Sequence, residues 1–226
     1  MSYVIYSVEG NRQRLDGGSM FGNVPQTVWS QWTAADDNGR IPLACRAFLI
    51  HDTVRDLRIL LEAGIGTFFE QGLRDRFGVT EPDHKLLVNL ANLGLEPGQI
   101  DVVILSHLHF DHAGGLLTAW RPDGSYEMVF PNARFLVSTG AWERARQPHL
   151  RDRASFIFEI QDLLERSGRL ELVDDHRSDT LGPDFSFFRS DGHTPGMLIT
   201  ELRGKRRGVV FCGDLIPGCP WIHLPV

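Results

Sequence analysis

The sequence has no long hydrophobic run, and this excludes a helix that spans a membrane. Its apolar runs, such as 101–105 and 208–212, have the length of strands, whereas a membrane span needs about 18 apolar residues. The first ten residues contain Glu9 and no basic stretch ahead of an apolar run. We therefore expect no signal peptide.

Cysteines and basic clusters are also scarce. Cys45, Cys212 and Cys219 are an odd number without regular spacing, which favours a reducing compartment and argues against a structural disulfide. The net charge is -6, and the one basic block is 205–207, which argues against a nucleic-acid-binding surface. We expect a cytoplasmic protein that acts on a small-molecule substrate and binds neither nucleic acid nor membrane. A homodimer stays open.

The 226 residues, of which 42% are hydrophobic, suffice to bury one core, and no repeat or linker divides them. We expect a single domain over 1–226. Apolar runs and alternation predict strands over 3–8, 41–50, 57–61, 102–105, 133–137, 169–173, 185–188, 197–202 and 208–212. Helical spacing predicts one helix from Asp83 to a cap at Gly94, and a second from Phe156 to near Gly168.

The most informative segment follows the predicted strand 102–105. Residues 107–112 read His-x-His-x-Asp-His, and imidazole and carboxylate are ligands that zinc and similar metals prefer. His107 and His109, one residue apart on an extended segment, point to the same side and can hold one ion. Asp111 and His112 follow after a turn and can serve a second ion. The segment lies at the carboxyl end of a strand, where open α/β folds place their sites.

Three further candidates lie at the ends of predicted strands or in turns between them. Glu62 ends the strand 57–61, His193 lies in a turn, and Asp214 follows an apolar run. A carboxylate at the end of a buried strand needs a partner, because burial without one is costly. A metal ion is such a partner, and the two oxygens of Asp214 could bridge two ions.

Together these motifs resemble the metallo-β-lactamase superfamily. The resemblance rests on 107–112, on Gly-His-Thr-Pro-Gly at 192–196 and on Gly-Asp at 213–214. It implies an α/β fold, a four-layer αβ/βα sandwich with the metals at the sheet edges. It also implies that His107, His109 and His193 bind the first ion, that Asp111 and His112 bind the second, and that Asp214 lies between them. Residues 16–22 and the segment 214–218 are similar to the lactonase-like and organophosphate-hydrolase-like branch.

The chain departs from the family pattern at two places. Glu62 stands where the family usually carries an aspartate that supports the site through hydrogen bonds, and a longer carboxylate can do the same. The family's last histidine ligand lies some tens of residues past the bridging aspartate, but here only 215–226 follow. We expect a fragment that lacks its last strand and helix; the alternative is that His223 substitutes for the missing ligand.

The resemblance implies a metal-dependent hydrolase with two divalent ions, most simply zinc, although iron or manganese also suits these ligands. A metal-bound hydroxide would attack an ester, lactone, thioester or phosphoester bond. Asp111 would be catalytic, orienting that water and passing a proton to the leaving group. Two alternatives stay open: an iron-dependent oxygenase or oxidoreductase on the same fold, and a truncated, inactive metal-binding domain.

Other residues have both a structural and a functional interpretation. The apolar side chains within 20–32, together with Phe68 and Phe69, either pack in the core or wall a substrate pocket. Cys212 reads as a small buried hydrophobic residue. The remaining histidines, His51, His84, His149 and His176, lie outside any ligand pattern and are expected at the surface.

Overall fold

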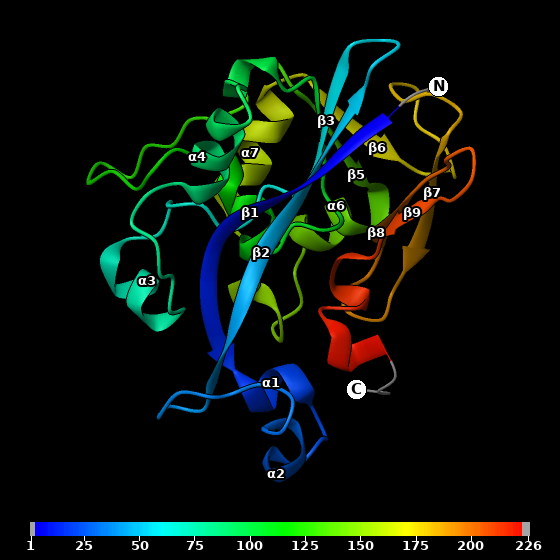
Figure 1. Cartoon of the computed structure of the whole chain (residues 1–226). Coiled ribbons are helices and arrows are strands. Elements are labelled where there is room, and N and C mark those ends of the chain that lie inside the picture. Colours follow the sequence, from blue (N-terminus) through cyan, green and yellow to red (C-terminus); the bar gives the residue numbers. More distant parts are fainter. Residues whose placement is uncertain (1–2, 223–226) are drawn as a thin grey trace.

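The computed structural model describes residues 3–222, which form a six-stranded sheet in the order β1-β2-β3-β4-β5-β6 and a three-stranded sheet in the order β7-β8-β9 (Figure 1). The strands are β1 (Tyr3–Asp16), β2 (Arg40–Asp52), β3 (Leu57–Leu61), β4 (Val102–Ile104), β5 (Arg134–Ser138), β6 (Leu170–Val173), β7 (Phe185–Ser190), β8 (Met197–Leu202) and β9 (Val209–Phe211). The α-helices are α1 (Gly17–Phe21), α2 (Gln26–Trp29), α3 (Gln71–Arg76), α4 (Lys85–Asn92), α5 (Phe110–Ala113), α6 (Thr139–Arg146) and α7 (Phe158–Arg166). His223 lies outside the described residues.

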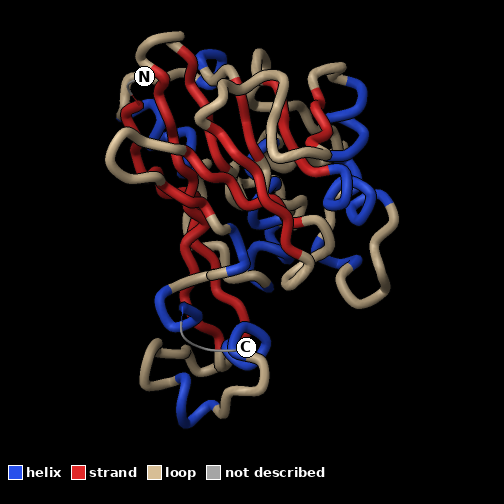
Figure 2. Tube along the Cα trace, turned by 90° about the vertical axis from the view of Figure 1, so that its right-hand side faces the viewer, coloured by secondary structure: helices blue, strands red, loops and turns tan. Residues whose placement is uncertain are grey.

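The larger sheet has one hydrophobic core on each of its two faces. On one face, Leu60, Val103 and Phe135 belong to a cluster that includes Leu86 of α4 and Leu164 of α7. On the opposite face, side chains of β2 to β6 pack against those of β7 and β8. The described chain therefore stacks as helices, six-stranded sheet and three-stranded sheet (Figure 2). Among residues 3–222, no helix has the length and apolar character needed to cross a membrane.

The directions of the strands determine at which edge of the sheet the site lies. β1, β2 and β3 pair antiparallel, whereas β3, β4, β5 and β6 pair parallel. The three residues of β4 are all buried, as expected for a central parallel strand covered on both faces. Since parallel strands end at one edge, the residues that follow β3, β4 and β5 gather there.

The β1–β2 hairpin extends beyond the rest of the sheet and carries α1 and α2 at its far end (Figure 1). A small separate core forms there around Phe21, which stacks on Trp29 at 5.4 Å and on Trp221 at 4.4 Å between ring centroids. Most of the apolar side chains predicted within 20–32 therefore pack locally. β1 continues to Asp16, well past the predicted end at Val8.

Asp52, at the end of β2, is a buried carboxylate whose hydrogen bonds stabilise the fold. It accepts hydrogen bonds from the backbone N–H groups of Val54 and Arg55 and from the Arg55 side chain. Burial alone would raise the pKa of Asp52, but these donors outweigh burial and lower it. A lowered pKa in the folded state means that the carboxylate stabilises the fold above its unfolded pKa of about 4. That stabilisation is lost as pH falls through the folded pKa.

We expect Asp52→Asn to lower the free energy of unfolding at pH 7 by about 1–3 kcal/mol, because buried donors lose a charged acceptor. The deficit should shrink as pH falls below about 4, where Asp52 itself becomes protonated. Urea unfolding of both proteins at pH 7 and at pH 3 measures this. A deficit of the same size at both pH values would contradict the prediction.

Candidate metal centre

The loop after β4 carries most of the candidate ligands. Ser106, His107 and His109 are buried, and His109 stands at the N-terminus of the single-turn helix α5, which includes Asp111 and His112. The other two candidates come from the smaller sheet. His193 lies in the turn between β7 and β8, and Asp214 in a 3-10 turn after β9. The structure thus brings all six predicted residues to one edge of the sandwich.

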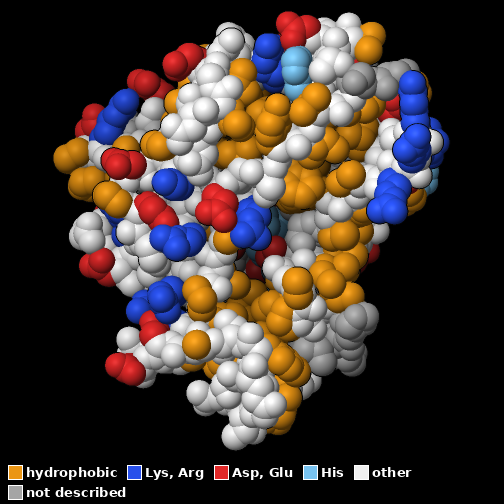
Figure 3. Space-filling view, viewed as in Figure 1, with side chains coloured by type: hydrophobic (Ala, Val, Ile, Leu, Met, Phe, Trp, Pro, Cys, Tyr) orange, Lys and Arg blue, Asp and Glu red, His pale blue; other side chains and the backbone are white. Residues whose placement is uncertain are grey.

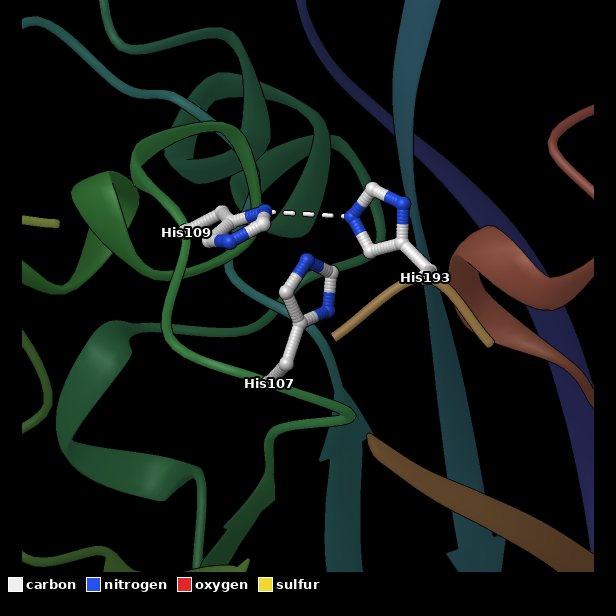
Figure 4. A group of neighbouring side chains, drawn as sticks. All are labelled: His107, His109 and His193. Atoms are coloured by element: carbon white, nitrogen blue, oxygen red, sulfur yellow. Dashed lines mark hydrogen bonds between the residues drawn. The ribbon is translucent and has the colours of Figure 1, made fainter. Parts of the chain in front are cut away.

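Three histidines form the first donor group, which comprises His107, His109 and His193. One ligand atom of each lies within 4.8 Å of the others. His193 Nε2 is 3.1 Å from His109 Nδ1, and the His107 ring lies beside both (Figure 4). Convergent imidazoles at this spacing can hold one metal ion.

The second donor group comprises His107, His112 and Asp214, whose ligand atoms also lie within 4.8 Å of one another. Asp214 Oδ1 is 3.2 Å from His112 Nε2, and Asp214 Oδ2 is 3.5 Å from His193 Nε2. Each oxygen of Asp214 therefore faces a different donor group, as a bridging carboxylate requires. Asp111 lies next to the second group, with Oδ1 3.9 Å from His112 Nε2.

The electrostatic surroundings shift the pKa values of the histidines in opposite directions. Burial, followed by the neighbouring imidazoles, lowers the pKa of His107 well below its usual value and that of His109 to about 3. Burial would also lower the pKa of His112, but Asp214, Asp111 and Glu62 outweigh it and raise that pKa well above the usual value. The neutral imidazoles of His107 and His109 are in the form that binds metal.

The donor set fits a divalent metal. Among residues 3–222, His107 Nε2 is buried and has no hydrogen-bond partner, and an unsatisfied buried polar atom is costly. A cation held among the three histidines, beside carboxylates, would satisfy this nitrogen. Imidazole with carboxylate suits zinc, and also iron and manganese.

Glu62 supports the cluster, as the resemblance implied. Its Oε1 accepts a hydrogen bond from the Ser106 N–H at 2.9 Å, and its Oε2 is 3.3 Å from His112 Nδ1. Glu62 adopts a positive φ of 69°, a strained conformation for a residue with a side chain. It belongs to neither donor group, so it orients His112 through the ring nitrogen that faces away from Asp214.

Gly115 lets the ligand loop pass close to the loop after β3. Its N–H donates to Gly64 O at 2.8 Å, and a Cβ at this position would lie 2.0 Å from the Ala63 carbonyl oxygen. We expect Gly115→Ala to lower the free energy of unfolding by about 1–3 kcal/mol, because backbone must move to admit the methyl group. Chemical denaturation measures this loss.

Gly72 provides the control for that variant. It lies in α3, and the nearest atom to an added Cβ is Glu70 Oε1 at 3.8 Å, an ordinary contact. Gly72→Ala should leave stability unchanged or raise it by up to about 1 kcal/mol. If both variants had the stability of the natural protein, the close approach of the two loops would be excluded.

Two polar residues near the site are not among the predicted residues. Gln13 on β1 donates from Nε2 to Asp111 Oδ2 at 2.7 Å. His84 was expected at the surface, and this is wrong: it is half-buried, with Nε2 3.0 Å from Gly115 O, and burial lowers its pKa. Neither contact has a signal in the local sequence, because both join distant segments.

Two cavities lie near the cluster. The site cavity, of about 480 Å³, contains Asp111, His112 and Asp214 and has apolar walls that include Met20 and Phe211. Figure 3 shows apolar side chains bordering a hollow near the middle of this face. Its lining also includes Gln13, Leu43, Phe48 and Val210.

The aromatic cavity, of about 450 Å³, is lined by Phe68, Phe69, Phe77 and Phe156 but by none of the candidate ligands. It adjoins the cluster at Phe156, whose ring lies 4.9 Å from that of His109. Met20 of the 20–32 segment lines the site cavity, whereas Phe68 and Phe69 line the aromatic cavity.

Comparison with known proteins identifies the fold. The chain is similar to a probable metal-dependent hydrolase from Staphylococcus aureus, with 29% identity and a TM-score of 0.82, covering 94% of this chain and 73% of that one. It also resembles AidC, a dizinc quorum-quenching lactonase, with 20% identity and a TM-score of 0.72, covering 95% and 72%. The similarity to AidC, at this level of identity, shows a shared fold alone.

A curated relative, Ribonuclease TTHA0252 of Thermus thermophilus, is 29% identical over 127 residues, which is 56% of this chain and 28% of the relative. The match thus spans less than a third of that protein. The family model of the metallo-beta-lactamase superfamily matches residues 40–226, which include all six candidate ligands. With two facing sheets and the donor cluster at their shared edge, the chain belongs to the metallo-beta-lactamase superfamily.

Proposed function

We propose that this protein is a hydrolase that uses two divalent ions, most simply zinc, to cleave an ester, lactone, thioester or phosphoester bond. One observation carries the proposal. Two donor groups share His107 and are connected by Asp214, whose two oxygens face different groups. A pair of adjacent metal positions that share a bridging carboxylate is typical of hydrolytic two-metal sites.

In this proposal His107, His109 and His193 hold the first ion, and Asp111 and His112 hold the second, with Asp214 between them. Ions held in these positions would supply hydroxide at neutral pH, because divalent ions lower the pKa of water toward about 7. Asp111 lies at the edge of the site cavity. From there its carboxylate could take up a proton and deliver it to the leaving group.

The residues that line the site cavity determine which kind of substrate can bind. Leu43 and Phe48 of β2 and Val210 and Phe211 of β9 give it apolar walls, while Asp111, His112 and Asp214 lie within it. A small molecule with an apolar acyl or aryl group fits this lining, with its scissile bond at the cluster. The aromatic cavity holds none of these ligands, so we place the reacting group in the site cavity.

The solved structures support this class. AidC is described as a dizinc lactonase with a homoserine product bound, and a second structure of similar fold is a hydrolase of the beta-lactamase superfamily, at 23% identity with a TM-score of 0.69. The ribonuclease relative is the reason to keep phosphoesters among the substrates. Cys45, Cys212 and Cys219 are free thiols, which agrees with the proposed cytoplasmic location.

The first test is elemental analysis of the purified protein, together with hydrolysis assays on lactone, ester, thioester, phosphotriester and phosphodiester substrates. We expect about two zinc ions per chain and hydrolysis that a chelator abolishes. Bound iron together with oxygen-dependent turnover would favour the oxygenase alternative. One ion or fewer, with no hydrolysis, would favour an inactive metal-binding domain.

A further inference from the structure

Gln13 occupies an unusual place for a glutamine. It lies on β1 opposite Leu43 of β2, and only 1% of its surface is exposed. Its Nε2 donates to Asp111 Oδ2 at 2.7 Å, across 98 residues of sequence. Gln13 also borders the site cavity. An amide on the first strand of the fold therefore holds a carboxylate of the candidate metal centre.

The other half of the amide is not satisfied. Gln13 Oε1 is buried and has no hydrogen-bond partner among the described residues. A buried amide can make several hydrogen bonds, and leaving its oxygen without one is unfavourable. A methionine would fill the same volume without this cost. The sequence therefore keeps a residue that is poor for packing at the position that contacts Asp111.

The chemistry of the amide suits the neighbourhood of a cation. A lysine or arginine at position 13 would neutralise Asp111 and repel a metal ion. The neutral amide fixes one oxygen and leaves the negative charge in place. Within residues 3–222, Asp111 Oδ1 forms an ion pair with His112 Nε2 at 3.9 Å. With Oδ2 engaged by Gln13, Oδ1 is left facing the second donor group.

We propose that Gln13 is a positioning residue that fixes the Asp111 carboxylate so that Oδ1 faces the second ion. The inference rests on the proposed function, because it assigns Asp111 to that ion. Outer contacts that orient metal ligands typically change metal affinity by about 10- to 100-fold. The effect should fall on the second ion alone, because Gln13 contacts none of the three histidines of the first donor group.

Asn11 provides a matched control on the same strand. It is buried, and the exposed Arg12 separates it from Gln13. Its Nδ2 donates to Asp83 O at 2.7 Å, and its Oδ1 accepts from the Lys85 N–H at 3.0 Å. Asn11 therefore ties β1 to the start of α4 and contacts no candidate ligand. Asn11→Leu removes a buried amide of similar kind without touching Asp111.

The experiment titrates metal-free protein with Zn²⁺ in competition with a chromophoric chelator, so that the affinity of each ion is measured without any substrate. We expect Gln13→Met to weaken the second ion by about 10- to 100-fold and to leave the first unchanged. Asn11→Leu should lower thermal stability while both zinc affinities stay as in the natural protein. If Gln13→Met does not fold, Gln13→Asn serves instead, because its shorter amide cannot reach Asp111.

The outcomes separate the two proposals. Two ions in the natural protein, with equal second-ion affinity in Gln13→Met, would overturn the role of Gln13 and leave the proposed function standing. Equal weakening in Asn11→Leu and Gln13→Met would also overturn that role, because a general loosening of β1 would explain both. Fewer than two ions in the natural protein would contradict the proposed function, and the inference with it.

Discussion

His107→Ala is expected to remove metal-dependent hydrolysis entirely and to reduce the metal content from two ions per chain to one or fewer. His107 is fully buried, and it is the one residue that belongs to both donor groups. In the proposed assignment it is a ligand of the first ion, and its ring lies 4.1 Å from that of His112, a ligand of the second ion. Without the ions, a water in the site regains a pKa near that of bulk water, about 16, and supplies no useful hydroxide at neutral pH.

Elemental analysis and a hydrolysis assay on the same sample test this result. His149→Ala is the control, because His149 is exposed and its side chain accepts a hydrogen bond from the Arg151 N–H, far from the donor groups in the sequence. That variant should keep its metal and its activity. Full activity in His107→Ala would refute the metal centre, whereas loss of activity in both variants would point to a general defect in folding.

Asp111→Asn is expected to lower turnover by about 10²- to 10⁴-fold in protein saturated with metal, the range for loss of a general acid–base group. The substitution keeps the shape of the side chain but removes its charge and its capacity to carry a proton. Gln13 adds a second effect. Because Gln13 Nε2 needs an acceptor at 2.7 Å, the new amide will direct its oxygen there and its NH₂ group toward the second donor group.

The assay for Asp111→Asn must be run at several zinc concentrations, so that lost affinity and lost turnover are distinguished. Asp162→Asn is the control, because Asp162 is an exposed carboxylate on α7. Near-normal turnover of Asp111→Asn at saturating zinc would remove Asp111 from the chemistry and leave it, at most, a ligand. A fall in turnover that excess zinc fully reverses would also mean that Asp111 acts as a ligand and not in proton transfer.

The ligand loop could be predicted from the sequence because its signals are local. Val102–Ile104 is a short apolar strand, and the histidines follow it at once, so strand, turn and ligands fall within about a dozen residues. The same holds for β2, β3 and β8, whose predicted limits lie close to those of the structure. The α/β sandwich itself followed from the resemblance and is confirmed by the family match and the solved structures.

Long-range polar contacts could not be predicted. Beyond Val8, β1 buries Asn11 and Gln13 in place of apolar side chains, so the alternation that marks a strand is lost just where the strand approaches the site. His84 is held by a carbonyl group 31 residues away, across the turn at Gly115. Partners of this kind are set by tertiary packing, which the local pattern of a sequence does not record.

The hydrogen bond from the Leu198 N–H to Ser106 O, at 2.7 Å, joins the smaller sheet to the segment that carries His107. The side chain of Ser138, at the end of β5, likewise donates to Gly196 O, next to the turn that holds His193. Ions bound between His107 and Asp214 would link segments more than a hundred residues apart, and because such a site exists only in the folded chain, the free energy of metal binding would add to the stability of the fold. The bound metal would then hold the two sheets together as well as take part in the chemistry. A chelator would loosen this edge of the sandwich while both cores stay packed.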